Sequence, residues 1–412
     1  MTGERPVSAV DWAALRLQDR YPRNPMEVGA ILRFGGPSPR VGEFRRHLAA
    51  SVPELWTVLV RPPGRRRPGW AAREPDWEGL VRHRALPETS GETGLRLAAE
   101  EIQAAPLPRE GHLWRTWLLD GYAEDEWALV IQCSHAQFDA AGLWGLAARC
   151  FPSADARPAR PARPPRKSVD LWTVLKGLAR YARGFFPLSG RTFSSHGLTG
   201  ERRLVFETVE LARLTRIGHR HGATVNEVFL AALAGALRAW PHTPWRTGRP
   251  GAVWTLLGID IRALDGTPGP GNRLAVTRYR LPCDEADATV RLRLLVRTGS
   301  ATKSSGAANV GRAGIRLLPD WLLGLLARWS LSRWYTEMIV ANVPGPAIPP
   351  VFGGRNLRST VPLGLLQHGR PLGVFLSSVA GQATLNVTTD SSLPSGAGLV
   401  RLWLAALDEL DG

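Results

Sequence analysis

A stretch rich in proline, arginine and alanine between residues 151 and 167 constrains the fold more than any other feature of this sequence. Such a composition favours a stiff, extended chain and supplies few side chains that could pack a core. It therefore predicts two halves, an N-terminal one over residues 1–150 and a C-terminal one over residues 201–412, each of ordinary domain size. The connector between them, residues 151–200, also contains a basic amphipathic helix pattern at 171–186.

Both halves show helix and strand patterns in alternation, which predicts an α/β or α+β fold with sheet and helix in each half. The turn-like residues 120–126 lie between two apolar runs and predict a hairpin that leads directly to His135. The expected elements are a helix over 11–17 opened by Asp11, strands over 28–34, 113–119, 127–133, 203–209, 253–261, 274–281 and 374–379, and a helix over 223–240 opened by Thr224.

Charge and cysteine content narrow the class of protein. The formal net charge of +16 favours anionic partners such as coenzyme A, a carrier protein, nucleic acid or an anionic membrane, and does not choose among them. The three cysteines form no disulfide framework or metal-ligand spacing, and no apolar run is long enough to cross a bilayer. We therefore expect a cytoplasmic protein, with peripheral contact to the inner membrane face as an option.

The segment from Ser134 to Gly142 carries the strongest chemical signal. A histidine at the exit of a buried strand suits proton transfer near neutral pH, because its imidazole titrates in that range. Asp139 follows four residues later and could orient the turn through backbone hydrogen bonds or by pairing with a buried arginine. An isolated pattern of this kind is more often structural, with His135 ending a strand and Asp139 capping a helix.

Several motifs, in order along nearly the whole chain, resemble the bacterial wax ester synthase/diacylglycerol acyltransferase family. His135 and Asp139 resemble its HHxxxDG motif. Further matches are Ser8–Asp11 with Asn24–Gly29 for the N-terminal signature, His112–Trp114 for PLW, Ala223–Val228 for ATVND and Ala341–Pro346 for SNVPGP.

The resemblance implies two chloramphenicol-acetyltransferase-like halves with a central tunnel that meets His135. It implies that His135 is the general base that moves an acyl group from an acyl-CoA or acyl carrier protein thioester to an alcohol or amine. Asp139 would pair with Arg262 in a structural salt bridge, and Ser134 and Gly142 would support the turn. No cofactor or metal would be needed, and Trp114, Asn226, Asn342 and Pro344 would be candidates for the substrate tunnel.

Departures from the family pattern leave the substrate open. Ser134 replaces the first motif histidine, Ala140 the glycine, His112 the proline of PLW and Glu227 the aspartate of ATVND. Wax ester or triacylglycerol synthesis is the family default, and ester or amide formation on a specialised metabolite is the alternative. A non-catalytic scaffold is a second alternative. Nucleic-acid binding is not expected, since only the charge favours it and no recognition motif is present.

Two further segments have competing interpretations. His219 and His221 stand two residues apart with no third ligand, so a solvated helix end is favoured over a metal site. The apolar run from Trp321 to Trp334 could dock on a membrane or admit an acyl chain. A core helix is the favoured prediction for that run.

Overall fold

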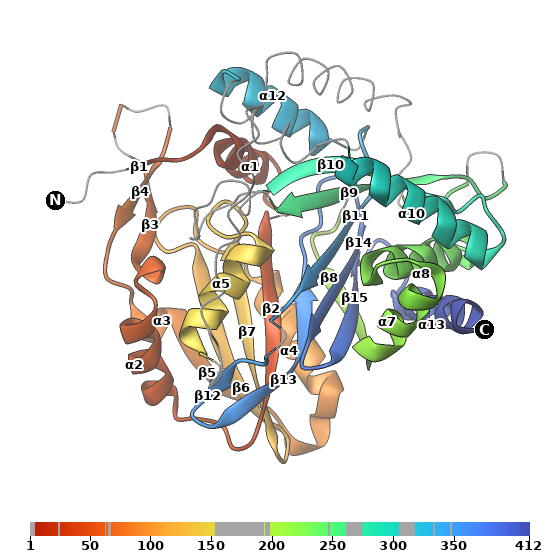
Figure 1. Cartoon of the computed structure of the whole chain (residues 1–412). Coiled ribbons are helices and arrows are strands. Elements are labelled where there is room, and N and C mark those ends of the chain that lie inside the picture. Colours follow the sequence, from red (N-terminus) through yellow and green to blue (C-terminus); the bar gives the residue numbers. More distant parts are fainter. Residues whose placement is uncertain are drawn as a thin grey trace.

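Two six-stranded sheets, each flanked by helices, form the framework of the molecule (Figure 1). The computed structural model describes residues 5–23, 25–61, 63–64, 67–152, 193, 198–245, 248–260, 274–304, 318–332, 334–346 and 348–412. The mixed α/β fold expected from the sequence is confirmed. Most of the predicted connector, its amphipathic helix at 171–186, and Arg262 lie outside the described residues.

The first sheet holds the strand that leads to His135. Its order is β12 (Val351–Phe352), β13 (Arg355–Leu363), β2 (Glu27–Gly35), β7 (Glu126–Ser134), β6 (Trp114–Ala123) and β5 (Val81–Ala85). β7 is bonded on both sides, to β2 and β6, and both pairings are antiparallel. Gly29 permits the close approach of β2 to β7, because a Cβ there would lie 1.8 Å from the carbonyl oxygen of Ile131.

The first sheet is not built from the N-terminal half alone. β13 comes from the C-terminal half of the sequence and pairs with β2 in antiparallel register, with Val361 opposite Ile31. Residues after 350 thus complete the N-terminal sheet, and the division at residue 201 describes chain order but not sheet membership.

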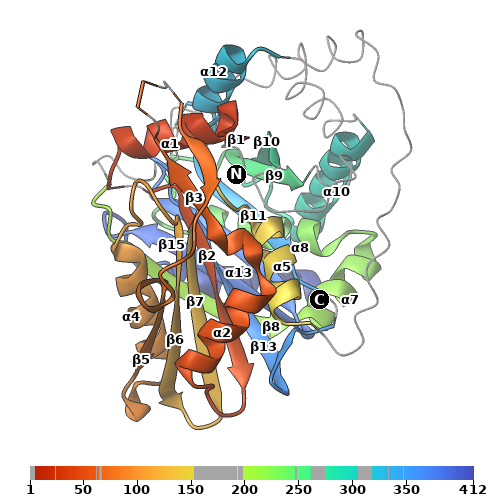
Figure 2. The same cartoon turned by 90° about the vertical axis from the view of Figure 1, so that its left-hand side faces the viewer.

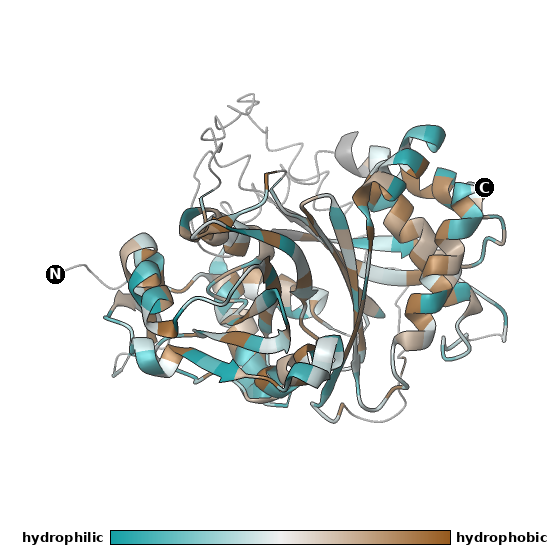
Figure 3. Cartoon of the chain, turned by 90° about the horizontal axis from the view of Figure 1, so that it is seen from below, coloured by the Kyte–Doolittle hydropathy of each residue, from teal (hydrophilic) through white to brown (hydrophobic). Residues whose placement is uncertain are grey.

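The second sheet and its helices form the larger hydrophobic core. Its order is β10 (Leu274–Leu281), β9 (Val253–Asp260), β11 (Met338–Pro344), β14 (Leu372–Val379), β15 (Gln382–Asp390) and β8 (Arg202–Glu210). The helices are α7 (Leu211–His221), α8 (Val225–Ala239), α10 (Ala288–Ser304) and α13 (Ala397–Asp411). Figure 3 shows helices gathered beside the sheet near the C-terminus, with hydrophobic and hydrophilic residues mixed along them.

Helix α8 is the centre of that layer. Every residue from Glu227 to Leu237 is buried, and α8 packs against α7, α10 and α13. Thr224 caps it as the sequence predicts, with its side chain accepting from the Glu227 backbone while the Glu227 carboxylate accepts from the Thr224 backbone N–H at 2.7 Å. Glutamate at this position completes a capping box, which is a physical reason for its presence where the family motif has aspartate.

The remaining elements cover the edges and one end of the sheets. They are the small sheet β1 (Arg5–Pro6), β4 (Gly69–Ala72) and β3 (Thr57–Val60), the helices α1 (Ala9–Arg20), α2 (Val41–Ser51), α3 (Trp77–Leu80), α4 (Gly91–Ala104), α5 (Ala140–Cys150) and α12 (Asp320–Ser330), and the 3-10 turns Pro53–Trp56 and Glu88–Ser90. Within the described part of the chain, none of the helices combines the length and apolar character that crossing a bilayer requires.

Two predicted element boundaries are wrong. The first helix opens at Ala9, because the Ser8 side chain caps it by accepting from the Asp11 backbone N–H at 3.1 Å; Asp11 itself is buried in the first turn. The hairpin turn is shorter than residues 120–126. β6 continues to Ala123 through an irregularity at Gly121, whose φ of 82° glycine adopts readily.

The predicted core helix in the run from Trp321 to Trp334 is also wrong. Helix α12 lies on the surface beside α1, as Figures 1 and 2 both show, and only Ser330 among its residues is buried. The apolar pattern indicated a helix correctly, but a pattern cannot tell how many sides of a helix the rest of the chain will cover.

Candidate active site

His135 stands in the short loop that joins β7 to α5. Its backbone N–H donates to the carbonyl of Met26 at 2.8 Å, which ties the loop to the residue just before β2. β7 is a central strand with partners on both sides. The position of His135 is therefore fixed by the regular ladder of the first sheet.

Ser134 shapes the turn that follows. Its carbonyl accepts from the backbone N–H groups of Gln137 at 3.0 Å and Phe138 at 3.1 Å, and its hydroxyl accepts from Ala136 N–H at 3.3 Å. The residue is buried. A serine at the first motif position thus has a local structural role in this chain, consistent with the predicted support of the motif.

Asp139 caps helix α5. Its side chain is fully buried and accepts from the backbone N–H of Gly142 at 2.8 Å, which satisfies one of the amides that a helix start leaves unbonded. This hydrogen bond to a backbone N–H is of the kind that the sequence suggested for Asp139, while the support of the motif by Asp139 and Gly142 stays a prediction. The predicted pairing with Arg262 stays a prediction.

The surroundings of His135 favour its neutral form. Burial among protein atoms lowers the pKa of His135 below its ordinary value, and this exceeds the opposing effects of the Asp139 charge and a hydrogen bond with its own backbone. Its side chain still keeps partial solvent exposure. At neutral pH the imidazole is therefore unprotonated and able to accept a proton.

A buried polar cluster behind the motif was given no role by the sequence analysis. Glu27 lies opposite Ser134 in the ladder, and its carboxylate accepts from the Leu107 N–H at 2.8 Å and from the Gln132 side chain. Arg202, at the start of β8, donates to the carbonyl of Pro25 at 2.9 Å. This cluster joins the second sheet to the segment that holds His135, and no local pattern signals it because its members are far apart in sequence.

In this cluster, burial disfavours the charged forms of Glu27 and Arg202, whereas the attraction between the two charges favours them. Burial raises the pKa of Glu27, while the Leu107 N–H and the nearby Arg202 charge act in the other direction. Burial also lowers the pKa of Arg202. The two side chains therefore stabilise each other's ionised forms in a place where either charge alone would be costly.

The motif segment at residues 341–346, which forms the end of β11 and the two residues after it, lies against the motif helix α5. Gly345 donates its N–H to the Ser378 carbonyl at 2.7 Å, and a Cβ on Gly345 would lie 2.8 Å from the ring of Trp144 in α5. Asn342 is half-buried in β11, and Pro344 is exposed at its end. The structure thus brings the end of β11, from the second half of the sequence, beside the helix that Asp139 caps.

Two other tunnel candidates have different surroundings. Trp114 is only 3% exposed and its indole N–H donates to the Leu55 carbonyl at 2.9 Å, so it supports the sheet under the motif and presents little surface to a substrate. Asn226 lies in the first turn of α8, whose neighbours are α7, α10, α13 and β10, and so belongs to a different layer from His135.

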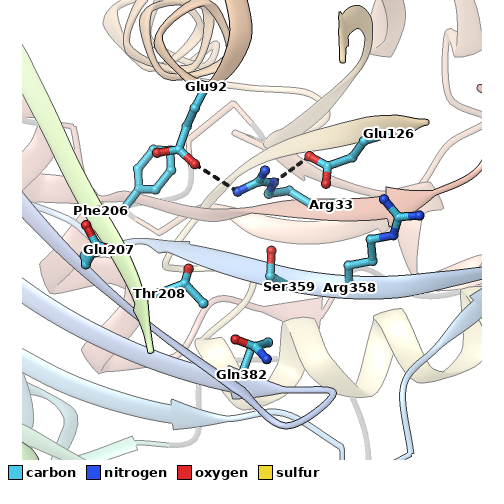
Figure 4. Close-up of a pocket in the computed structure, with 9 residues that line it drawn as sticks. All are labelled: Arg33, Glu92, Glu126, Phe206, Glu207, Thr208, Arg358, Ser359 and Gln382. Atoms are coloured by element: carbon cyan, nitrogen blue, oxygen red, sulfur yellow. Dashed lines mark hydrogen bonds and ion pairs between the residues drawn. The ribbon is translucent and has the colours of Figure 1, made fainter. Parts of the chain in front are cut away.

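A cavity lies at the other end of β7, away from His135. It has a volume of about 260 Å³ and is lined at the far end of β7 by Glu126, together with Arg33, Glu92, Phe206, Glu207, Thr208, Arg358, Ser359 and Gln382 (Figure 4). Arg33 binds Glu126 at 2.7 Å and Glu92 at 3.2 Å. Glu126 and Glu92 are thus already paired with Arg33, and this cavity is a separate site from the loop that carries His135.

Among the described residues, no group of three or more His, Cys, Asp or Glu side chains is arranged so that it could hold a metal ion. His219 and His221 lie in the last turn of α7, where histidine is favourable at the C-terminal end of a helix. This placement agrees with the predicted solvated helix end.

Comparison with known proteins identifies the family. The wax ester synthase/diacylglycerol acyltransferase catalytic domain matches residues 8–179, and the C-terminal domain of the same family matches residues 270–411. The probable diacylglycerol O-acyltransferase tgs1 of Mycobacterium tuberculosis is 23% identical over 95% of this chain and 92% of its own length.

Solved structures agree at the level of the fold. The wax ester synthase/diacylglycerol acyltransferase of Marinobacter aquaeolei VT8 has a TM-score of 0.69 at 22% identity, covering 98% of both chains. The first condensation domain of the calcium-dependent antibiotic synthetase has a TM-score of 0.69 at 17% identity, covering 100% of this chain and 96% of that one. The chain therefore belongs to the wax ester synthase/diacylglycerol acyltransferase family.

Proposed function

We propose that this acyltransferase moves an acyl group from a coenzyme A or carrier-protein thioester to a hydroxyl or amine, with His135 as the general base. The observation that carries the proposal is a partly exposed imidazole whose neutral form is favoured by burial, on a residue whose backbone N–H is bound by the Met26 carbonyl at the end of a central strand. A buried, helix-capping Asp139 follows it four residues later. Family membership supports the reaction class.

One base is enough for the proton transfers of this reaction. The acceptor oxygen or nitrogen forms a bond to the thioester carbonyl carbon as His135 takes its proton. The resulting tetrahedral intermediate collapses with cleavage of the carbon–sulfur bond, and the imidazolium returns the proton to the leaving thiolate. Such general-base help is worth roughly 10²–10⁴ in rate. A thiol with a pKa of about 8.5 is a good leaving group, so we propose that no cofactor is required.

Asp139 is a positioning residue in this scheme. Its cap fixes the start of α5, and its negative charge stabilises the imidazolium that forms when His135 takes the proton, since that charge raises the pKa of His135. The net charge of +16 would favour the phosphates of coenzyme A or of a phosphopantetheine carrier.

Two candidates fall within this reaction class, and the fold similarity to a condensation domain supports the second of them, transfer from a carrier-protein thioester to an amine of a specialised metabolite. The two candidates share the same base and differ in donor and acceptor. A long-chain alcohol or diacylglycerol acceptor would favour the lipid reaction, which is the first candidate because the family match spans most of the chain.

The test measures thiol release from a panel of acyl-CoA and acyl-pantetheine donors with long-chain alcohols, diacylglycerol and amines, with product mass confirmed. Wild type, His135→Ala and His219→Ala are compared, since His219 is an exposed histidine in α7 and serves as the matched control. We expect acceptor-dependent release that disappears only in His135→Ala. Equal release by His135→Ala and wild type would overturn the general-base assignment, and a folded wild type inactive on the whole panel would favour a binding scaffold.

A further inference from the structure

Helix α12 is apolar on two sides, and only one of them is covered. Leu322, Leu326 and Trp329 follow helical spacing and are half-buried, on a helix that packs beside α1. Trp321 and Leu325 form a second stripe and are 71% and 54% exposed. A helix that is apolar all round is normally buried, so the exposed stripe calls for a partner outside the described chain.

Basic groups accompany the exposed stripe. Arg328 lies on the same face, seven residues after Trp321, and Arg16 and Arg20 are exposed on the neighbouring α1. None of these three guanidinium groups forms an ion pair with another described residue, although Arg16 lies 6.0 Å from the Trp12 ring centroid and Arg20 5.7 Å from that of Tyr21. Exposed tryptophan and leucine beside exposed arginines suit the boundary of an anionic bilayer.

The α1–α12 surface, comprising these exposed residues of the two helices, is held firmly in place. The buried Arg370 donates to the carbonyls of Ser330 and Ser332 and so fixes the end of α12. Arg67 binds Asp320 at 2.8 Å at the other end. Contacts at both ends therefore fix the orientation of α12 and of its exposed apolar stripe.

The inner side of the same helix pair lies over the motif. Ala14 and Leu17 of α1 and Leu331, just after α12, share a hydrophobic cluster with Met26. The Met26 carbonyl is the group that accepts from His135 N–H at 2.8 Å. One layer of side chains thus separates the helix pair from the backbone that holds the candidate base.

We propose that the α1–α12 surface docks on an anionic lipid bilayer, with Trp321 and Leu325 entering the interface and Arg328, Arg16 and Arg20 facing lipid phosphates. Charge argues against a second copy of the chain as the occupant, because a two-fold contact would bring the same arginines together. The docking does not depend on the proposed acyl transfer, and its test contains no acyl substrate, so either can fail without the other.

The test is flotation of the full chain with phosphatidylcholine vesicles, with and without phosphatidylglycerol. We expect binding only to the anionic vesicles and its loss at high salt. Trp321→Ser/Leu325→Ser should weaken binding by about tenfold or more, since it removes the inserted apolar surface. Arg328→Gln should weaken it by about fivefold, the effect of one basic residue at an anionic surface.

The matched control is Leu97→Ser, because Leu97 is 52% exposed on α4, which Figures 1 and 2 place well away from α12. This variant should float like wild type. Equal flotation of Trp321→Ser/Leu325→Ser and wild type would overturn the proposal. A change of oligomeric state in that double variant, with flotation unaltered, would also overturn it and assign the surface to a second copy.

Discussion

Strand β7 has a polar site at each end, and the two differ in whether their titratable group is already held by a partner of opposite charge. At the C-terminal end of the strand, burial lowers the pKa of His135 and so favours its neutral form. At its start, Glu126 is bound by Arg33 at 2.7 Å and by the Tyr122 hydroxyl at 2.8 Å. A cavity of about 260 Å³ lies at the Glu126 end. We propose that proton transfer takes place at the other end, because the Glu126 carboxylate is already held by Arg33 and Tyr122.

The largest expected effect separates the two ends directly. His135→Ala should reduce acceptor-dependent thiol release by roughly 10²–10⁴, because the base is lost. Glu126→Gln, on the same strand, should leave the rate unchanged. Initial rates under saturating donor measure both effects. A comparable loss of rate in Glu126→Gln, with its fold intact, would contradict our account, because it would place the reaction at the Glu126 end of β7.

The ion pairs of Arg33 with Glu92 and Glu126 should contribute to the stability of the fold and not to the rate of acyl transfer. Burial by itself would lower the pKa of Arg33, but the hydrogen bond and charge of Glu126 raise it above its ordinary value. Arg33→Met should lower the free energy of unfolding by about 1.5–3 kcal/mol, measured by urea denaturation.

The control for Arg33 is Arg358→Met, because Arg358 pairs with Asp125 at 2.7 Å on the exposed rim of the same cavity. An exposed pair is worth about 0–1 kcal/mol, so this variant should change stability much less. A larger loss of stability in Arg358→Met than in Arg33→Met would contradict the view that the ion pairs of Arg33 stabilise the Glu126 end of β7.

Asp139 offers a smaller test at the other end. Asp139→Ala removes the cap of α5 and should cost about 1 kcal/mol of stability, whereas Asp139→Asn keeps a good cap. Differential scanning calorimetry of the two variants would measure this. Equal destabilisation by both substitutions would show that the charge of Asp139, and not its cap, dominates its contribution to stability.

The sequence predicted the regular elements better than their surroundings. The capped helix at Thr224 and the hairpin before His135 follow from local signals, namely a capping box and two apolar runs around a turn. The family motifs supplied the hypothesis that His135 is the general base.

The features that sequence patterns did not predict depend on contacts distant in sequence. Trp114 is buried in strand β6, β13 pairs with β2 of the N-terminal half, and α12 lies half-exposed on the surface where a core helix was predicted. The Arg202–Glu27 cluster was also not foreseen, because it joins residues from opposite halves of the sequence. Periodicity reports that a face is apolar, and only the tertiary arrangement decides what covers it.

The central claim is that His135 acts as a neutral base, and the pH dependence of kcat/KM tests it most directly. Because the pKa of His135 is lowered from about 6.5, the rate should be flat near neutral pH and fall only below that value, as the imidazole takes a proton. Asp139→Asn removes a charge that raises this pKa, so its acid limb should move to still lower pH. An acid limb centred above about 6.5, or one that Asp139→Asn leaves in place, would contradict the account.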